Sequence, residues 1–173
     1  GKGDDTEHGV WGLDSDNRLS MLDWWHGQTS SDEWIERLLD MITKWKPLCV
    51  FGEAGVIAKA VEPSLKRRMM ERKVFARMEW LPSINDKPTR ARAFQSRAAM
   101  GLVSLPETEA GERVLSQLLT FPAGKYDDAV DVCSLMGMAI DAAHSGIVSA
   151  APPPAQNNSG YTSRRPEGVS WRV

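Results

Sequence analysis

The sequence predicts an α/β domain in which helices flank a mixed central sheet. The chain has 173 residues, 42% of them hydrophobic, which is enough for one domain with its own core. Short apolar runs typical of strands alternate with longer amphipathic runs typical of helices. From residue 150 the chain is rich in Pro, Ser, Asn and Gly with little to bury, so we predict a domain over 1–149 and a flexible tail over 150–173.

A hairpin and a helix are predicted first. The runs 8–14 and 18–25 are typical of strands, and the polar residues between them favour a turn, so the two runs should pair as a hairpin. Ser30 and Glu33 have the spacing of a capping box, and the apolar residues that follow recur with a helical period. Pro47 marks the end of this helix.

The middle of the chain predicts a strand, a helix and another strand. The run 48–53, "LCVFGE", is short and largely apolar, as in a strand buried on both faces, and it ends on Glu53. In the helix that follows, 63–72 is the more secure part, because Pro63 favours a first turn or a break. The run 74–82 predicts the next strand.

Helices dominate the last third of the domain. The run 85–100 predicts a helix that carries Arg90, Arg92 and Arg97 on its surface. After it, a short extended piece and two helices are predicted at 101–106, 111–121 and 126–144.

Composition narrows the class of protein. The formal net charge of -2 leaves the partners open, since a basic groove can lie beside an acidic site. Cys49 and Cys133 lie inside apolar runs, which predicts buried free thiols of a reducing compartment rather than a disulfide framework or a metal knuckle. No apolar run is long enough to span a bilayer and the first residues lack a signal-peptide pattern, so a soluble intracellular protein is expected.

The stretch "FPAGKYDDAVD" crowds three carboxylates at the start of the last predicted helix. On a helix, Asp131 shares a face with Asp127 or with Asp128, and such acids can simply favour the helix N-terminus. Glu53, however, ends a predicted buried strand, where open sheets place functional groups and where an isolated carboxylate needs a partner. With no His or Cys at ligand spacing, this all-oxygen set suits two Mg²⁺ or Mn²⁺ ions, the usual device for phosphodiester cleavage.

The chain resembles the C-terminal nuclease domain of the large terminase subunit of tailed bacteriophages, which has a ribonuclease-H-like fold. The resemblance runs from about Gly9 to Ile140 and rests on "VWGLDSDNRLSMLDWWHGQ", "KWKPLCVFGEAG", "DKPTRARAF", "GLVSLP" and above all "LLTFPAGKYDDAVDVCSL". It implies an endonuclease that cuts concatemeric double-stranded DNA with two metal ions. It implies Glu53, Asp127 and Asp128 as catalytic metal ligands, with Asp131 as a further ligand or a group behind the ligands.

The resemblance also implies partners and a location. The partners are double-stranded DNA, the terminase ATPase domain, the small terminase subunit and the portal protein. The location is the host-cell cytoplasm, at the procapsid portal vertex during packaging.

Two features depart from the family. The family's first catalytic Asp lies on the first strand of its sheet, whereas "GKGDDTEHGVWG" resembles the loop and second strand that follow, so Asp4 and Asp5 are not expected to replace that acid. The motif G-x-x-x-x-G-K-[ST] of the family's ATPase motor does not occur, so this chain should not hydrolyse ATP by itself.

DNA must reach the acids, so basic residues should line the approach. Lys87, Arg90 and Arg92 in "DKPTRARAF", and Lys125 beside the acids, are the candidates for phosphate contacts, with a solvated helix face as the alternative. The denser basic run 66–68 favours an ordinary charged helix face over a second DNA contact. In the tail, a short docking motif or a disordered end would account for Arg164, Arg165 and Trp171.

Two other functions stay open. A non-catalytic DNA-gripping or portal-docking module of the same fold would explain the missing first-strand acid. A resolvase, integrase or transposase would keep the chemistry and change the DNA substrate, although the context "FPAGKYDDAVD" favours a terminase. For each of these functions, contacts to the DNA backbone alone would give little preference for a particular DNA sequence.

Overall fold

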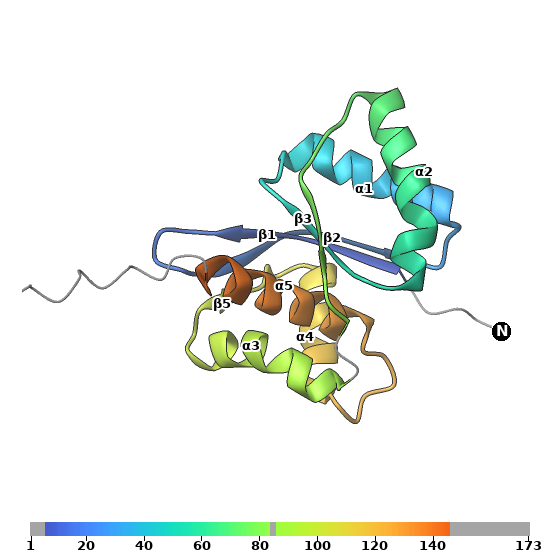
Figure 1. Ribbon diagram of the computed structural model, residues 1–173. Coiled ribbons are helices and arrows are strands. Elements are labelled where there is room, and N and C mark those ends of the chain that lie inside the picture. Colours follow the sequence, from blue (N-terminus) through green and yellow to red (C-terminus); the bar gives the residue numbers. More distant parts are fainter. Residues whose placement is uncertain (1–5, 84–85, 146–173) are drawn as a thin grey trace, which may run out of the picture.

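The computed structural model describes residues 6–83 and 86–145, and its elements form three layers (Figure 1). Helices α1 (Ser31–Trp45) and α2 (Val56–Arg72) cover one face of the strands. The other face is covered by α3 (Lys87–Ala99), α4 (Glu109–Thr120) and α5 (Asp128–Ser145). The predicted α/β class is confirmed. The predicted tail, with Arg164, Arg165 and Trp171, and the pair Asp4 and Asp5 lie outside the described residues.

The strands form two hydrogen-bonded sheets rather than one. The predicted hairpin is present as β1 (Thr6–Leu13) and β2 (Leu19–Gly27), and β5 (Val103–Ser104) pairs with β2 in parallel. The strands β3 (Val50–Glu53) and β4 (Met78–Leu81) form a separate parallel pair. Within residues 6–83 and 86–145 the strand orders are β1-β2-β5 and β3-β4, so β1 and β3 each keep one edge outside these ladders.

Each helical layer encloses a core of its own. Aliphatic side chains from α1 and α2 pack on the β3–β4 pair, whereas the other core joins β2 to α3, α4 and α5. The buried residues of the first core include Ile35, Leu39, Ile42 and Leu65. Those of the second include Leu19, Phe94, Val114 and Cys133.

The predicted start of α1 is confirmed, and the prediction for α2 is corrected. Ser30 caps α1 by accepting from the backbone N of Glu33 at 3.4 Å. By contrast, α2 runs unbroken from residue 56, whereas the sequence supported a helix most strongly over 63–72. Pro63 lies inside the helix at an exposed position, where water can reach the carbonyl group that lacks its usual donor.

Two arginines of α3 are buried, against the prediction that all three lie on its surface. Arg97 is only 9% exposed. Its Nη1 donates to both the carbonyl oxygen and Oδ1 of Asn17, each at 3.2 Å, and these bonds compensate for its burial. Arg90 is 7% exposed and points into the acidic cluster described below. Of the three arginines predicted on this surface, only Arg92 is exposed.

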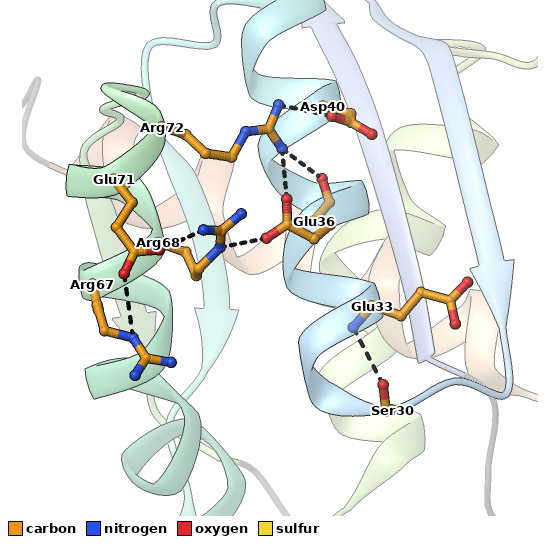
Figure 2. Close-up of polar contacts among 8 residues, drawn as sticks. All are labelled: Ser30, Glu33, Glu36, Asp40, Arg67, Arg68, Glu71 and Arg72. Atoms are coloured by element: carbon orange, nitrogen blue, oxygen red, sulfur yellow. Dashed lines mark hydrogen bonds and ion pairs between the residues drawn. The ribbon is translucent and has the colours of Figure 1, made fainter.

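The basic run 66–68 is neutralised by acids, as the charged-face interpretation predicts. Figure 2 shows that Arg68 and Arg72 of α2 point at α1, where Glu36 receives both of them. Arg68 Nε lies 2.6 Å from Glu36 Oε1, and Arg72 Nη2 lies 2.9 Å from Asp40 Oδ1. Exposed pairs of this kind contribute little to stability, because water and salt screen the two charges. The pairs within α2 itself are Lys66–Glu62, Arg67–Glu71 and Arg68–Glu71.

A buried ion pair ties β1 to α4. The side chain of Glu7 is 1% exposed, and Arg113 Nη2 lies 2.5 Å from its Oε1. The indole Nε1 of Trp24 donates to the other oxygen at 2.8 Å. Both oxygens of the carboxylate therefore have a donor, which is the condition for burying a charge of this kind.

The two predicted free cysteines are confirmed as free, Cys133 buried and Cys49 half-buried. None of the helices within the described ranges is long and apolar enough to cross a membrane.

The ring of His8 makes the stability of the fold depend on pH. It stacks on Trp25, its Nε2 lies 3.1 Å from the carbonyl oxygen of Trp34, and burial lowers its pKa from 6.5 to about 4. Between these two values the unfolded chain binds the proton and the folded chain does not, so acid favours unfolding. We expect His8→Gln to remove about 2 kcal/mol of the stability difference between pH 7 and pH 5, measured by urea unfolding. The exposed His26→Gln serves as the control, and equal pH profiles for both variants and the original chain would contradict the assignment.

Candidate acidic site

The acid predicted at a strand end lies at the exposed edge of the β3–β4 pair. Glu53 is the last residue of β3, and its side chain is 42% exposed. The hydroxyl of Ser83, just beyond β4, donates to Glu53 Oε1 at 2.5 Å. Because β3 and β4 are parallel, their carboxyl ends meet at one edge, and this brings Ser83 to Glu53.

A buried guanidinium joins this strand end to α5. Arg90 Nη1 lies 3.1 Å from Glu53 Oε1, and its Nη2 donates to Asp131 Oδ1. The planar fork of arginine can serve two carboxylates at once, which a lysine amine cannot do with the same geometry. Glu53 and Asp131, on separate elements, are therefore held around one cation.

The N-terminus of α5 is capped by another helix rather than by the crowded acids alone. Asp128 is the first helical residue, and the carbonyl of Asp127 accepts the backbone N–H of Asp131 at 3.1 Å. Gln117 of α4 accepts the backbone N–H of Ala129 at 2.9 Å in a buried position. One amide that a helix start leaves unpaired is thus satisfied by α4.

A second cation lies between the two aspartates of this helix start. Lys87 Nζ is 2.6 Å from Asp127 Oδ2 and 3.2 Å from Asp131 Oδ2. Burial lowers the pKa of Lys87, but the hydrogen bonds and charges of Asp127 and Asp131 raise it by more, so the pKa lies above its ordinary value. The amine is therefore protonated at neutral pH and neutralises part of the acidic charge.

Close packing of α3 on α5 brings these opposite charges together. A Cβ atom placed on Gly137 of α5 would lie 2.6 Å from the backbone N of Phe94 in α3, which is closer than real Cβ atoms approach. The absence of a side chain at residue 137 lets the two helices approach, so that Lys87 and Arg90 reach Asp127 and Asp131.

The structure gathers most of the predicted site residues. Glu53, Asp127, Asp131, Lys87 and Arg90 form one cluster, which we call the acidic cluster, and Asp128 lies next to it in the chain. The remaining two predicted residues have other surroundings: Lys125 Nζ lies 5.0 Å from the ring centre of Tyr126, and Arg92 lines a groove with Arg97.

Two polar residues of this region escaped the sequence prediction. Ser83 follows β4 just as Glu53 ends the parallel strand β3, and the predicted β-α-β order could have pointed to it. Gln117 sits in an otherwise amphipathic helix, and no pattern in the sequence marks it as a cap for α5.

The donor chemistry of the cluster fits a hard divalent cation, because every acidic ligand offers carboxylate oxygen. The space between the carboxylates is occupied by the cationic groups of Lys87 and Arg90. In the part of the chain that the structure describes, no three His, Cys, Asp or Glu residues are placed to hold one metal ion together. A metal ion would have to take the place of Lys87 Nζ among these oxygens.

The overall fold is ribonuclease-H-like, as a comparison with solved structures shows. Among solved structures, RuvC of T. thermophilus in complex with a Holliday junction substrate matches with a TM-score of 0.51 and 14% sequence identity. The match covers 83% of this chain and 90% of that chain. No protein-family model and no curated protein matches the sequence. The likeness to RuvC shows the fold.

Proposed function

We propose that this chain is the metal-dependent endonuclease domain of a viral DNA-packaging terminase, which cuts concatemeric double-stranded DNA. One observation carries the proposal: a strand-end glutamate and the aspartates at the start of α5 meet in one half-exposed cluster. The ribonuclease-H-like fold and the sequence resemblance to terminase nuclease domains support it.

In this proposal Glu53, Asp127 and Asp128 hold two Mg²⁺ or Mn²⁺ ions, with Asp131 as a further ligand. When bound, such ions supply an activated water and stabilise the leaving oxygen of the phosphodiester. The chain's own contribution is positioning. Arg90 keeps Glu53 beside Asp131 through its two hydrogen bonds, and this contact survives if Lys87 swings away from the acids.

Phosphate contacts are proposed for Lys87, Arg92 and Lys125, whereas Arg90, which the sequence also suggested, is buried between Glu53 and Asp131 and keeps a positioning role. Lys87 neutralises Asp127 and Asp131 in the structure, and a divalent cation on these acids would release its amine toward a phosphate. Arg92 and Lys125 already have exposed side chains. Contacts of this type bind any duplex, so cleavage with little sequence preference is expected. The proposed protein partners are the terminase ATPase domain, the small subunit and the portal protein.

The proposal is tested by cleavage of plasmid DNA. Nicking is expected with Mn²⁺ or Mg²⁺ and none with chelator, and Glu53→Ala and Asp128→Ala should each lower the rate at least ~100-fold, since even residues behind a metal ligand are worth 10- to 100-fold. Glu107→Ala, an exposed acid on the loop before α4, is the matched control. Full activity in either site variant would remove these residues from the proposed ligand set.

A non-catalytic DNA-gripping or portal-docking module is the second candidate. The observation that favours it is that Lys87 and Arg90 occupy the space between the carboxylates. Salt-sensitive DNA binding without nicking at any metal concentration would select this function. Including a four-way junction among the substrates separates the terminase proposal from a resolvase of the same fold.

A further inference from the structure

A groove of about 580 Å³ runs along α3, where this helix lies beside α5 (Figure 1). Its volume is within the range of roughly 300–1,000 Å³ that is usual for ligand sites in proteins. Arg90, whose guanidinium belongs to the acidic cluster, lines the groove near the start of α3, and Arg97 lines it near the end. About 10 Å of helix separates these two positions, so this groove, which we call the arginine groove, leads away from the acidic cluster.

The hydrogen bonding of Arg97 points to an anionic ligand in this groove. Its guanidinium carries a positive charge, although the residue is only 9% exposed. The two groups that receive its Nη1, the carbonyl oxygen and Oδ1 of Asn17, are both neutral, so they satisfy hydrogen bonds without supplying a counter-charge. Its Nε is enclosed and has no partner among the described residues. A buried charge of this kind is stabilised when an anion comes beside it.

The other polar side chains of the groove select the kind of anion. Arg92 and Ser96 line it beside Arg97, and both are exposed. Guanidinium and hydroxyl groups are the usual donors to phosphate oxygens, and the planar fork of arginine can bind two of these oxygens at once. One carboxylate, that of Asp141 on α5, also lines the groove at an exposed position. The two guanidinium groups of Arg92 and Arg97 outweigh it, so the groove favours a phosphate.

We propose that the arginine groove binds a backbone phosphate of a nucleic-acid strand through Arg92 and Arg97. A free phosphate ion would leave most of the groove unused, whereas the sugar of a strand can contact the apolar side chains that line the same groove, Met100, Leu102 and Met138. The inference rests on the proposed function for its place on the DNA. At 3.4 Å per nucleotide, the ~10 Å between the acidic cluster and Arg97 corresponds to about three nucleotides from the bond that is cut.

Two methionines provide a local readout of binding. Met100 lines the groove and Met70 lies on α2, and they are 70% and 69% exposed, so they form a matched pair. In NMR spectra of the protein labelled at its methionine methyl groups, a short duplex DNA added with chelator should shift the Met100 signal and leave Met70 unchanged. Because no cleavage is needed, a shift without nuclease activity at any metal concentration would reject the proposed function alone. An unchanged Met100 signal in a protein that cuts DNA would overturn this inference alone.

Variants at exposed positions test the groove without disturbing the core. Arg92→Gln removes one charged contact and Ser96→Asp adds a carboxylate to the groove, so each should weaken DNA binding about tenfold, measured by fluorescence anisotropy with chelator. The matched controls are Arg37→Gln on α1 and Ser116→Asp on α4, which make the same changes of charge at exposed positions outside the groove. Equal affinities of the groove variants and their controls would overturn the proposal.

Competitors for the Met100 shift identify the ligand. Inorganic phosphate and a mononucleotide carry the same group without a strand, and poly-glutamate carries negative charge without phosphate. Each should need a concentration about 100-fold higher than the duplex, because a strand makes several contacts at once. A mononucleotide or phosphate as potent as the duplex would overturn the assignment to a strand, and equally potent poly-glutamate would overturn the assignment to phosphate.

Discussion

Replacing Arg113 by methionine is expected to lower the free energy of unfolding by about 3–5 kcal/mol, the effect of removing one partner of a buried ion pair. Arg113 lies 2.5 Å from the carboxylate of Glu7, whose side chain is 1% exposed. Without the guanidinium, that carboxylate keeps the hydrogen bond from Trp24 but loses its compensating charge. Urea unfolding at pH 7 measures the loss.

A second substitution separates charge from packing at this site. Glu7→Gln in the Arg113→Met background removes the stranded charge and keeps the shape, so most of the lost stability should return. A double variant no more stable than Arg113→Met would show that packing of the arginine, rather than the ion pair, holds β1 to α4.

Replacing Gly137 by valine is expected to destabilise the fold by about 3 kcal/mol, at the upper end of the usual effect of overpacking. The first added carbon would lie 2.6 Å from the backbone N of Phe94, and a backbone atom cannot turn aside as the end of a flexible side chain can. The helices α3 and α5 must therefore separate. Thermal or urea unfolding measures the effect.

The same variant tests how the acidic cluster is assembled. Separation of α3 from α5 should weaken the contacts of Lys87 and Arg90 with the aspartates, so divalent-ion binding and any cleavage should change together with stability. Gly55→Val is the matched control, since a side chain at residue 55 would meet nothing within 4 Å. Equal stability of the two glycine variants would contradict the close contact between α3 and α5.

Features that depend on neighbours in the sequence could be predicted, and those that depend on distant residues could not. The cap formed by Ser30 and Glu33 is local, and it is present as expected. The burial of Arg90 is not local, because it depends on how α3 meets β3 and α5. From sequence alone, an arginine-rich helix is expected to be exposed, because the acids that pair with its side chains lie far away in the chain.

The same distinction explains the sheet. Each strand could be recognised from its own apolar pattern, whereas which edges pair depends on residues far apart in the chain. The pattern of 48–53 indicated a strand buried on both faces, yet in the structure β3 is half-buried and pairs on one side. A cavity lined by Cys49, Val50 and Phe51 lies beside β3, and it accounts for the partial exposure of this strand.

For the acidic cluster, the sequence placed the acids correctly at a strand end and a helix start. It did not reveal that two of the four basic residues expected to contact phosphate, Lys87 and Arg90, would lie between those acids. The ion pairs of Lys87 and Arg90 depend on the close packing at Gly137, for which a single glycine within a helix is too weak a signal.

The charge network between α1 and α2 limits how strongly salt can act on any complex with nucleic acid. Affinity for a polyanion rises with the number of small cations that the protein displaces from the phosphates, and a side chain already paired with a carboxylate displaces few. Arg68 and Arg72 share Glu36, so the outer helical layer adds little to that count. In the proposed function, counterion release would therefore fall to exposed basic side chains of the opposite layer, such as Arg92, since Lys87 and Arg90 are paired with carboxylates as well.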